Sequence, residues 1–351
     1  MPSTNEPQSP LSPRGRGAGG EGANHSLSPQ PLSPQWRGAP EWDDSRILAL
    51  RPPRSTVDPS RPHAFLVEPE RTRAGTIEDT AVVFLINREC PFRCLMCDLW
   101  KYTTERRVPN GAIAGQIEYA LAQLSAVRHI KLYNAGNFFD AQAIPPADWP
   151  RIAELMRPFQ TVIVENHPRL VDRRCLAFRD LLRGPALQIA LGLETIHPDV
   201  LPRLNKRMTL ADFEKAVAFL TRHDVAVRAF ILLRPPFLDE EEGIRWATES
   251  IRFAFEVGVE CCVVIPTRTG NGTMEELQRR GDFSPPRIES LEAVLDHGIE
   301  LRRGRVFADL WDVERFYSCP RCGPARAERL RTMNLTQQSP PAIVCSCGSD
   351  R

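Results

Sequence analysis

Three cysteines stand close together in the stretch ECPFRCLMCDLW (89–100), in a C-x3-C-x2-C pattern. At these spacings, successive thiolates reach separate irons of one cluster without a long loop. A 4Fe–4S cluster that only carries electrons usually has four cysteine ligands, whereas this loop offers Cys90, Cys94 and Cys97. The pattern therefore predicts a 4Fe–4S cluster with one iron open to a small molecule. Zinc sites show the same distinction, because structural sites have four protein ligands whereas catalytic sites keep one position open. A zinc site with a distant fourth ligand, or three buried thiols, are the alternatives.

Four more cysteines stand near the C-terminus as two close pairs, Cys319 with Cys322 and Cys345 with Cys347. Two pairs separated in this way are typical of a four-cysteine structural zinc site. A second iron–sulfur cluster is the rival interpretation. The sequence therefore predicts a metal site in the C-terminal segment.

Arginines are enriched in the same part of the chain. Residues 302–331 hold eight arginines and four acidic residues, among them Arg326, Arg329 and Arg331. Such an excess is suited to RNA phosphates, and it is equally typical of a surface that is charged only for solubility.

The elements that must position these residues alternate between strands and helices. In residues 209–220, Leu210, Phe213, Val217 and Leu220 share one helical face and Thr209 is a suitable N-cap. Six βα units in succession imply parallel strands joined by right-handed crossovers. Six units are fewer than the eight of a closed barrel, so we expect an α/β fold with an open, partial parallel barrel and its site at the carboxyl ends of the strands. The apolar runs expected to be buried strands are residues 81–87, 129–134, 161–166, 187–194, 225–233 and 261–266.

The composition predicts four regions and a cytoplasmic protein. Lysine and arginine number 45 against 44 acidic residues, so overall charge predicts no partner. No apolar run is long enough for a membrane span and no apolar signal core begins the chain. The expected regions are a disordered Pro/Gly/Ser-rich leader (1–45), an extended lead-in (46–80), the partial barrel (81–304) and a C-terminal extension with the four-cysteine site (305–351).

The cysteine loop directly after the first predicted strand resembles that of the radical S-adenosylmethionine (SAM) enzymes. In that family the methionine part of SAM chelates the open iron, an external electron splits SAM, and a 5′-deoxyadenosyl radical removes hydrogen from a substrate carbon. Met96 is a departure, because the family usually has an aromatic residue just before the third cysteine. The resemblance implies a 4Fe–4S cluster and SAM as cofactors and a flavodoxin- or ferredoxin-like electron donor.

The other strand ends carry polar residues that match the SAM-binding positions of the family. The stretch 133–140 matches a small turn that binds the SAM amino group, and 191–195 ends in a carboxylate that contacts SAM. The alternatives are an ordinary Asn/Gly loop at 133–140 and a solvated charge run at 205–207. For His167, beside Glu165 at the end of the third predicted strand, a catalytic or SAM-contacting role and a strand-end cap are equally open. The predicted SAM-binding residues are Asn134, Gly136, Asn137, Glu165, Glu194, Asn205, Lys206 and Arg207.

Five stretches resemble the branch of the family that contains the Elongator catalytic subunit, and within it the archaeosine synthase radical SAM subunit. They are residues 164–168, 191–195, 204–209, 232–242 and 268–277. The resemblance implies C–N cleavage of a lysine-bearing 7-deazaguanine in tRNA, and a partner subunit that transfers the lysine. A radical SAM enzyme acting on a free small molecule, and a non-catalytic iron–sulfur or zinc RNA-binding module, are the alternatives.

Overall fold

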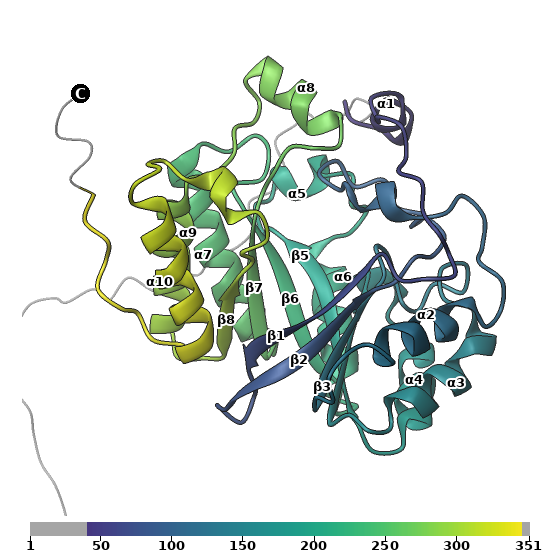
Figure 1. The fold of residues 1–351 in the computed structure, drawn as a ribbon. Coiled ribbons are helices and arrows are strands. Elements are labelled where there is room, and N and C mark those ends of the chain that lie inside the picture. The colour runs from purple at the N-terminus through teal and green to yellow at the C-terminus, as the bar shows by residue number, and fades with distance from the viewer. Residues whose placement is uncertain (1–40, 346–351) are drawn as a thin grey trace, which may run out of the picture. The chain divides into compact units, whose positions relative to one another are not determined.

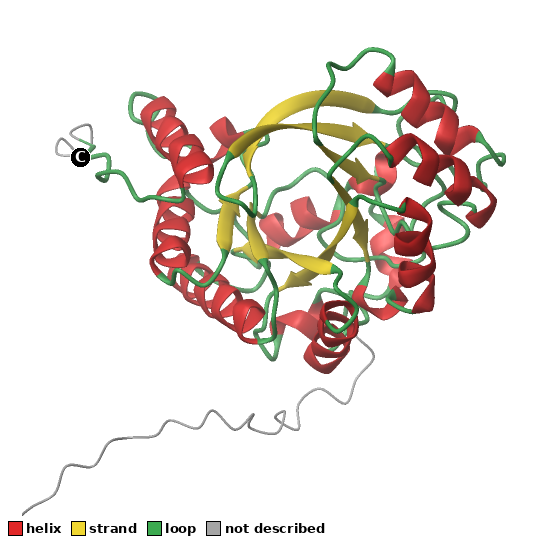
Figure 2. Ribbon diagram, turned by 90° about the horizontal axis from the view of Figure 1, so that it is seen from below, coloured by secondary structure: helices red, strands yellow, loops and turns green. Residues whose placement is uncertain are grey.

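Eight strands form one curved sheet in the computed structural model, which describes residues 41–345 (Figures 1 and 2). The strands follow one another in chain order across the sheet, and all neighbouring pairs from β2 to β8 are parallel. Figure 2 shows the strands curling around an interior, with helices outside them. The prediction of a partial parallel α/β barrel is therefore confirmed. The strands are β1 (Ala64–Arg71), β2 (Ile77–Phe84), β3 (His129–Tyr133), β4 (Thr161–Asn166), β5 (Ala186–Glu194), β6 (Ala226–Leu233), β7 (Cys261–Pro266) and β8 (Arg305–Ala308).

Strands β2 to β7 correspond to the six apolar runs, whereas β1 and β8 were not predicted as strands. β1 pairs antiparallel with β2 and lies in the region expected to be an extended lead-in. The second half of β1 has the sequence EPER, which is not an apolar run. Its glutamates pair with cations on the inner face of the sheet. β8 has only four residues, too few for a recognisable apolar run. The predicted leader falls mostly on residues 1–40, and these, like Cys347, lie outside the described residues.

The helices cover the outer face of the sheet or cross its carboxyl end. Helix α6 begins as predicted, because the Thr209 side chain accepts a hydrogen bond from the Asp212 backbone N–H in a capping box. Phe213, Val217 and Leu220 on its predicted apolar face are buried. The helices are α1 (Asp44–Ala49), α2 (Ala112–Leu121), α3 (Trp149–Met156), α4 (Arg173–Leu182), α5 (Val200–Arg203), α6 (Leu210–Thr221), α7 (Glu240–Glu256), α8 (Thr273–Arg280), α9 (Ile288–Glu300) and α10 (Gly323–Thr336).

Paired charges line the inner face of the sheet at the end away from the cysteines. Lys131 Nζ lies 2.5 Å from Glu70 Oε2, and Arg228 Nη2 lies 2.5 Å from Glu70 Oε1. Arg305 donates from Nη1 to the Arg71 carbonyl oxygen at 2.5 Å. Burial alone would raise the pKa of Glu70, but the cations of Arg228 and Lys131 hold it well below its usual value. These contacts join β1 to β3, β6 and β8, so they fix the open side of the barrel.

No helix within residues 41–345 is both long enough and apolar enough to cross a membrane.

Candidate functional site

The three clustered cysteines lie on an irregular loop after β2, at the carboxyl end of the parallel strands. Loops from two other strand ends hold this loop in place. The Leu95 N–H donates to the Leu204 carbonyl oxygen at 2.9 Å, and Asn271 Nδ2 donates to the carbonyl oxygens of Leu95 at 2.9 Å and Cys97 at 3.1 Å. A backbone hydrogen bond from the chain after β5 and two side-chain hydrogen bonds from Asn271, after β7, therefore hold the loop that carries the thiols.

The thiols of Cys90, Cys94 and Cys97 interact with one another electrostatically. The pKa of Cys94 is raised to about 12, mainly by burial and also by negative charge on Cys90, although the Lys206 ammonium acts in the opposite direction. Burial and the charges of Cys94, Asp98 and Cys90 likewise raise the pKa of Cys97. Thiols in these surroundings stay protonated at neutral pH unless a metal binds them, since a coordinated thiol is deprotonated outright. Asn137 Nδ2 also donates to Cys90 Sγ at 3.1 Å, so the structure brings predicted cluster and SAM residues together.

A carboxylate on β4 holds the predicted SAM-binding turn. Glu165 Oε1 accepts the Asn134 backbone N–H at 2.6 Å. Burial raises the pKa of Glu165, and the N–H groups of Asn134, Gly136 and Ala135 lower it, with the balance at about 7. Glu165 therefore binds the turn itself, and its predicted contact with SAM stays a prediction.

The Asn134 side chain is fully buried, and neither its amide oxygen nor its amide nitrogen has a hydrogen-bond partner among residues 41–345. Leaving a buried amide unpaired costs about 1–3 kcal/mol. A ligand with polar groups, bound beside the cysteines, would supply the missing partners. The thiol donor set and this amide thus fit an iron–sulfur cluster with SAM next to it.

Glu194 and Lys206 form a buried ion pair at the end of β5, with Lys206 Nζ 2.7 Å from Glu194 Oε1. The strand has a bulge between Gly192 and Glu194, and Glu194 has a φ of 65°. A Cβ at Gly192 would collide with the Glu194 carboxylate and the Lys206 ammonium, so glycine here lets the pair keep its position. Burial alone would lower the pKa of Lys206, but Glu194 and the neighbouring Cys94 raise it, so the ammonium stays charged beside the cysteine loop.

The other two residues of the predicted 205–207 run have partners within the chain. Asn205 Nδ2 donates to Asp44 Oδ1 and to the Arg93 carbonyl oxygen, both at 2.8 Å. Arg207 Nη2 donates to Asp44 Oδ2 at 2.5 Å. Their predicted contacts with SAM stay predictions, whereas their structural contacts join helix α1 to the cysteine loop.

His167, at the end of β4, links the cysteine loop to the 205–207 run. Its ring stacks on Phe92 with the centroids 3.8 Å apart. Nδ1 accepts the Arg169 N–H at 3.1 Å, so Nε2 carries the proton and donates to the Lys206 carbonyl oxygen at 3.0 Å. Burial lowers the pKa of His167 to about 3, so the ring is neutral. The structure therefore gives His167 the role of a strand-end cap.

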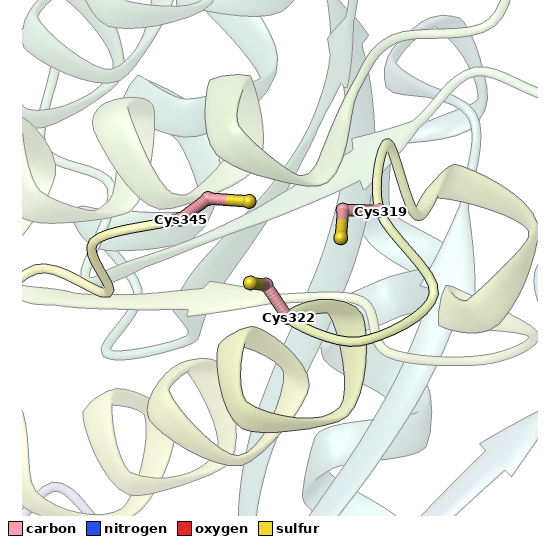
Figure 3. A group of neighbouring side chains, drawn as sticks. All are labelled: Cys319, Cys322 and Cys345. Atoms are coloured by element: carbon pink, nitrogen blue, oxygen red, sulfur yellow. The ribbon is translucent and has the colours of Figure 1, made fainter. Parts of the chain in front are cut away.

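The second cysteine group is brought together in space. The Sγ atoms of Cys319, Cys322 and Cys345 all lie within 4.8 Å of one another (Figure 3). Figure 3 shows Cys319 on the loop before α10, Cys322 at the start of that helix, and Cys345 on a separate segment. Three of the four predicted ligands thus form a candidate metal site, and three thiols leave zinc and iron–sulfur chemistry both open.

Arg326 and Arg329 were expected at the surface, either to bind RNA phosphates or for solubility, and the structure places them elsewhere. Both side chains are buried, and Arg329 Nη2 lies 2.8 Å from Asp296 Oδ1 while Arg326 pairs with Glu292. Arg326 Nη2 also donates to the Ile343 carbonyl oxygen at 2.9 Å, and Arg329 Nε donates to the carbonyl oxygens of residues 340 and 341, both at 3.1 Å. These arginines face α9 and hold the tail that carries Cys345.

Comparison with known proteins places the chain near a group of archaeal proteins. It is 26% identical over 211 residues to archaeosine synthase subunit beta of Thermococcus kodakarensis, covering 58% of this chain and 65% of that one. For the same subunit of Methanosarcina acetivorans the identity is 27% over 235 residues, covering 62% and 66%. The match therefore spans just under two thirds of these two relatives. An uncharacterized protein of Methanocaldococcus jannaschii is 21% identical over 320 residues, covering 84% and 87%. No protein-family model matches the chain.

Solved structures with a similar fold include the archaeal Elp3 of Methanocaldococcus infernus with an N-terminal deletion, at a TM-score of 0.49 and 16% identity over 63% of this chain and 59% of that one. A queuine lyase from Clostridium spiroforme, solved with SAM and queuine, has a TM-score of 0.48 and 15% identity over 71% and 96%. The resemblance to archaeosine synthase subunit beta that the strand ends predicted is thus confirmed as a similarity in sequence.

Proposed function

We propose that the chain is a radical SAM enzyme that acts on a 7-deazaguanine-type nucleoside in tRNA and cleaves a C–N bond of a lysine adduct. One observation carries the radical SAM part: three thiols, an unpaired buried amide and a buried ammonium meet at the carboxyl end of one partial barrel. The sequence similarity to archaeosine synthase subunit beta supports the choice of substrate.

Cys90, Cys94 and Cys97 would hold a 4Fe–4S cluster, and Asn134, with the turn that follows it, would face SAM. When bound, these cofactors supply a 5′-deoxyadenosyl radical that removes a hydrogen atom from the substrate.

The chain's own residues prepare the site for that chemistry. Asn137 donates a hydrogen bond to the Cys90 sulfur, and the Lys206 ammonium offsets negative charge on Cys94. Glu165 fixes the Asn134 turn through its backbone N–H groups. The fixed dipoles and charges are therefore in place before a ligand binds, which lowers the free-energy cost of reorganisation.

The C-terminal cysteines would hold a structural zinc ion. Binding there would tie the tail to α10, because metal affinity in such sites is coupled to the folding of the segments that supply the ligands. A lysine-transferring partner subunit and an external electron donor complete the proposed system.

A free small molecule is the second candidate substrate. The observation that favours it is the burial of Arg326 and Arg329, which removes two of the cations expected to bind RNA phosphates. Turnover of SAM by anaerobically reconstituted protein, with and without tRNA carrying the lysine-bearing base, tests the proposal. We expect that tRNA to be converted and the same tRNA without the lysine adduct to be left unchanged. SAM cleavage with no conversion of either tRNA would contradict the tRNA substrate and leave the small molecule.

A further inference from the structure

Residues 41–55, which we call the N-terminal strap, pack against the cysteine loop and bind Glu89 at its start. Glu89 directly precedes Cys90, and its carboxylate receives two arginines of the strap. Arg51 Nη1 lies 2.7 Å from Glu89 Oε1, and Arg54 Nη2 lies 2.6 Å from Glu89 Oε2. The Ser55 N–H donates to the Lys101 carbonyl oxygen at 3.1 Å. The strap is therefore attached on both sides of the loop that carries the three cysteines.

Apolar side chains anchor the other half of the strap over the same loop. Trp42 and Ile47 are buried in a small core with Leu95, which stands between the second and third cysteines. Met274 and Leu277 of α8, together with Phe283, complete that core. Figure 1 shows α1 and α8 at the same end of the barrel, where the strands finish. Burial of these side chains fixes α1 relative to the cysteine loop.

The Asp44 carboxylate uses both oxygens to hold the turn that contains Lys206. Oδ1 accepts from Asn205 Nδ2 at 2.8 Å and Oδ2 accepts from Arg207 Nη2 at 2.5 Å. Asn205 and Arg207 have φ angles of 49° and 57°. A left-handed backbone is unfavourable for residues with a side chain and persists only where its surroundings enforce it. Lys206 lies between them, with its ammonium against Glu194 and Cys94.

We propose that Asp44 is a positioning residue of the cofactor site, which holds Asn205 and Arg207 so that Lys206 stays beside Cys94 and the SAM-binding position. The inference rests on the proposed cluster and SAM function. The Asp44 carboxylate binds Asn205 and Arg207, which flank Lys206, so its effect on the cofactor site passes through Lys206.

The test compares Asp44→Ala with Glu41→Ala in anaerobically reconstituted protein. Glu41 is a matched control, since it is a carboxylate of the same strap that pairs with Arg280 and Arg46, away from the 205–207 turn. We expect Asp44→Ala to keep its iron, to bind SAM about tenfold more weakly, and to lose most of the change that SAM causes in the electron paramagnetic resonance spectrum of the reduced cluster. Glu41→Ala should match the wild type, and Asp44→Asn should be intermediate because it keeps one acceptor.

The variant Lys206→Met distinguishes an effect of Asp44 that passes through Lys206 from a general loss of structure. If Asp44 acts through Lys206, adding Asp44→Ala to Lys206→Met should weaken SAM binding no further, since residues that act through one another are not additive. Equal SAM affinity in Asp44→Ala and wild type, or additive losses in the double variant, would overturn the inference.

Amide hydrogen exchange of the protein without cluster distinguishes failure of this inference from failure of the proposed function. We expect Asp44→Ala, but not Glu41→Ala, to accelerate exchange in residues 204–208. Unchanged exchange there overturns the role of Asp44 even if no cluster ever forms. A wild-type protein that forms no SAM-responsive cluster refutes the proposed function instead.

Discussion

Lys206 Nζ lies 2.7 Å from Glu194 Oε1, and both side chains are buried where β5 ends beside the cysteine loop. The two residues are twelve positions apart and meet only because the strand bulges at Gly192 and the chain returns after α5. A buried charge without its partner is strongly unfavourable. The pair therefore belongs to the part of the site that is fixed before any ligand arrives.

Replacing Lys206 by Met should leave the Glu194 carboxylate buried and unpaired. We expect the free energy of unfolding to fall by about 3–5 kcal/mol, as measured by chemical denaturation. The double variant Lys206→Met with Glu194→Gln should recover much of that loss, because no uncompensated charge remains. Equal stability of Lys206→Met and wild type would show that the pair is not buried as described.

Replacing Gly192 by Ala should displace the same ion pair by steric collision. We expect a loss of about 1–3 kcal/mol in stability, together with weaker SAM binding. Gly115→Ala is the matched control, since a Cβ there meets nothing within 4 Å and Gly115 lies inside helix α2. That control should be neutral or slightly stabilising, and a Gly192→Ala protein that behaves like it would contradict the close packing.

Replacing both Arg326 and Arg329 by Gln should release the tail that carries Cys345. The metal bound at the C-terminal cysteines should then be lost more readily to a chelator, as followed by metal analysis of protein that also lacks Cys90, Cys94 and Cys97. Arg331→Gln is the control, because Arg331 lies on the same helix but is exposed and pairs only with Glu328 among the ion pairs of the described residues. Equal metal retention in the double variant and the control would contradict the role given to these two arginines.

Binding of tRNA should weaken steeply as salt increases, because each neutralised phosphate releases counterions. Filter binding over a range of salt concentrations measures the slope. An absence of affinity at roughly 0.15 M salt would exclude tRNA as the substrate and leave the radical chemistry intact.

The sequence predicted the parts of the molecule whose signal is local. Apolar runs identified β2 to β7, and the spacing of Cys90, Cys94 and Cys97 identified the loop, because each pattern lies within a few residues. β1 was missed because Glu68 and Glu70 face cations on β3 and β6, which no local pattern reveals.

Contacts between distant residues could not be predicted in the same way. Asp44 and Asn205 are 161 positions apart, and the sequence around either residue does not indicate that the two side chains are in contact. Arg326 and Arg329 were expected at the surface because arginine is usually exposed. Their partners, Glu292 and Asp296, lie on α9, and the packing of α9 against α10 exists only in the folded chain.

Reductive cleavage of SAM by anaerobically reconstituted protein tests the central claim most directly. Wild-type protein should hold about four irons at the first site and produce 5′-deoxyadenosine and methionine when a reductant is added. The triple variant Cys90→Ala, Cys94→Ala, Cys97→Ala should lose both the cluster and the cleavage. Cleavage that persists unchanged in the triple variant would contradict the account, as would wild-type protein that holds the cluster and never cleaves SAM.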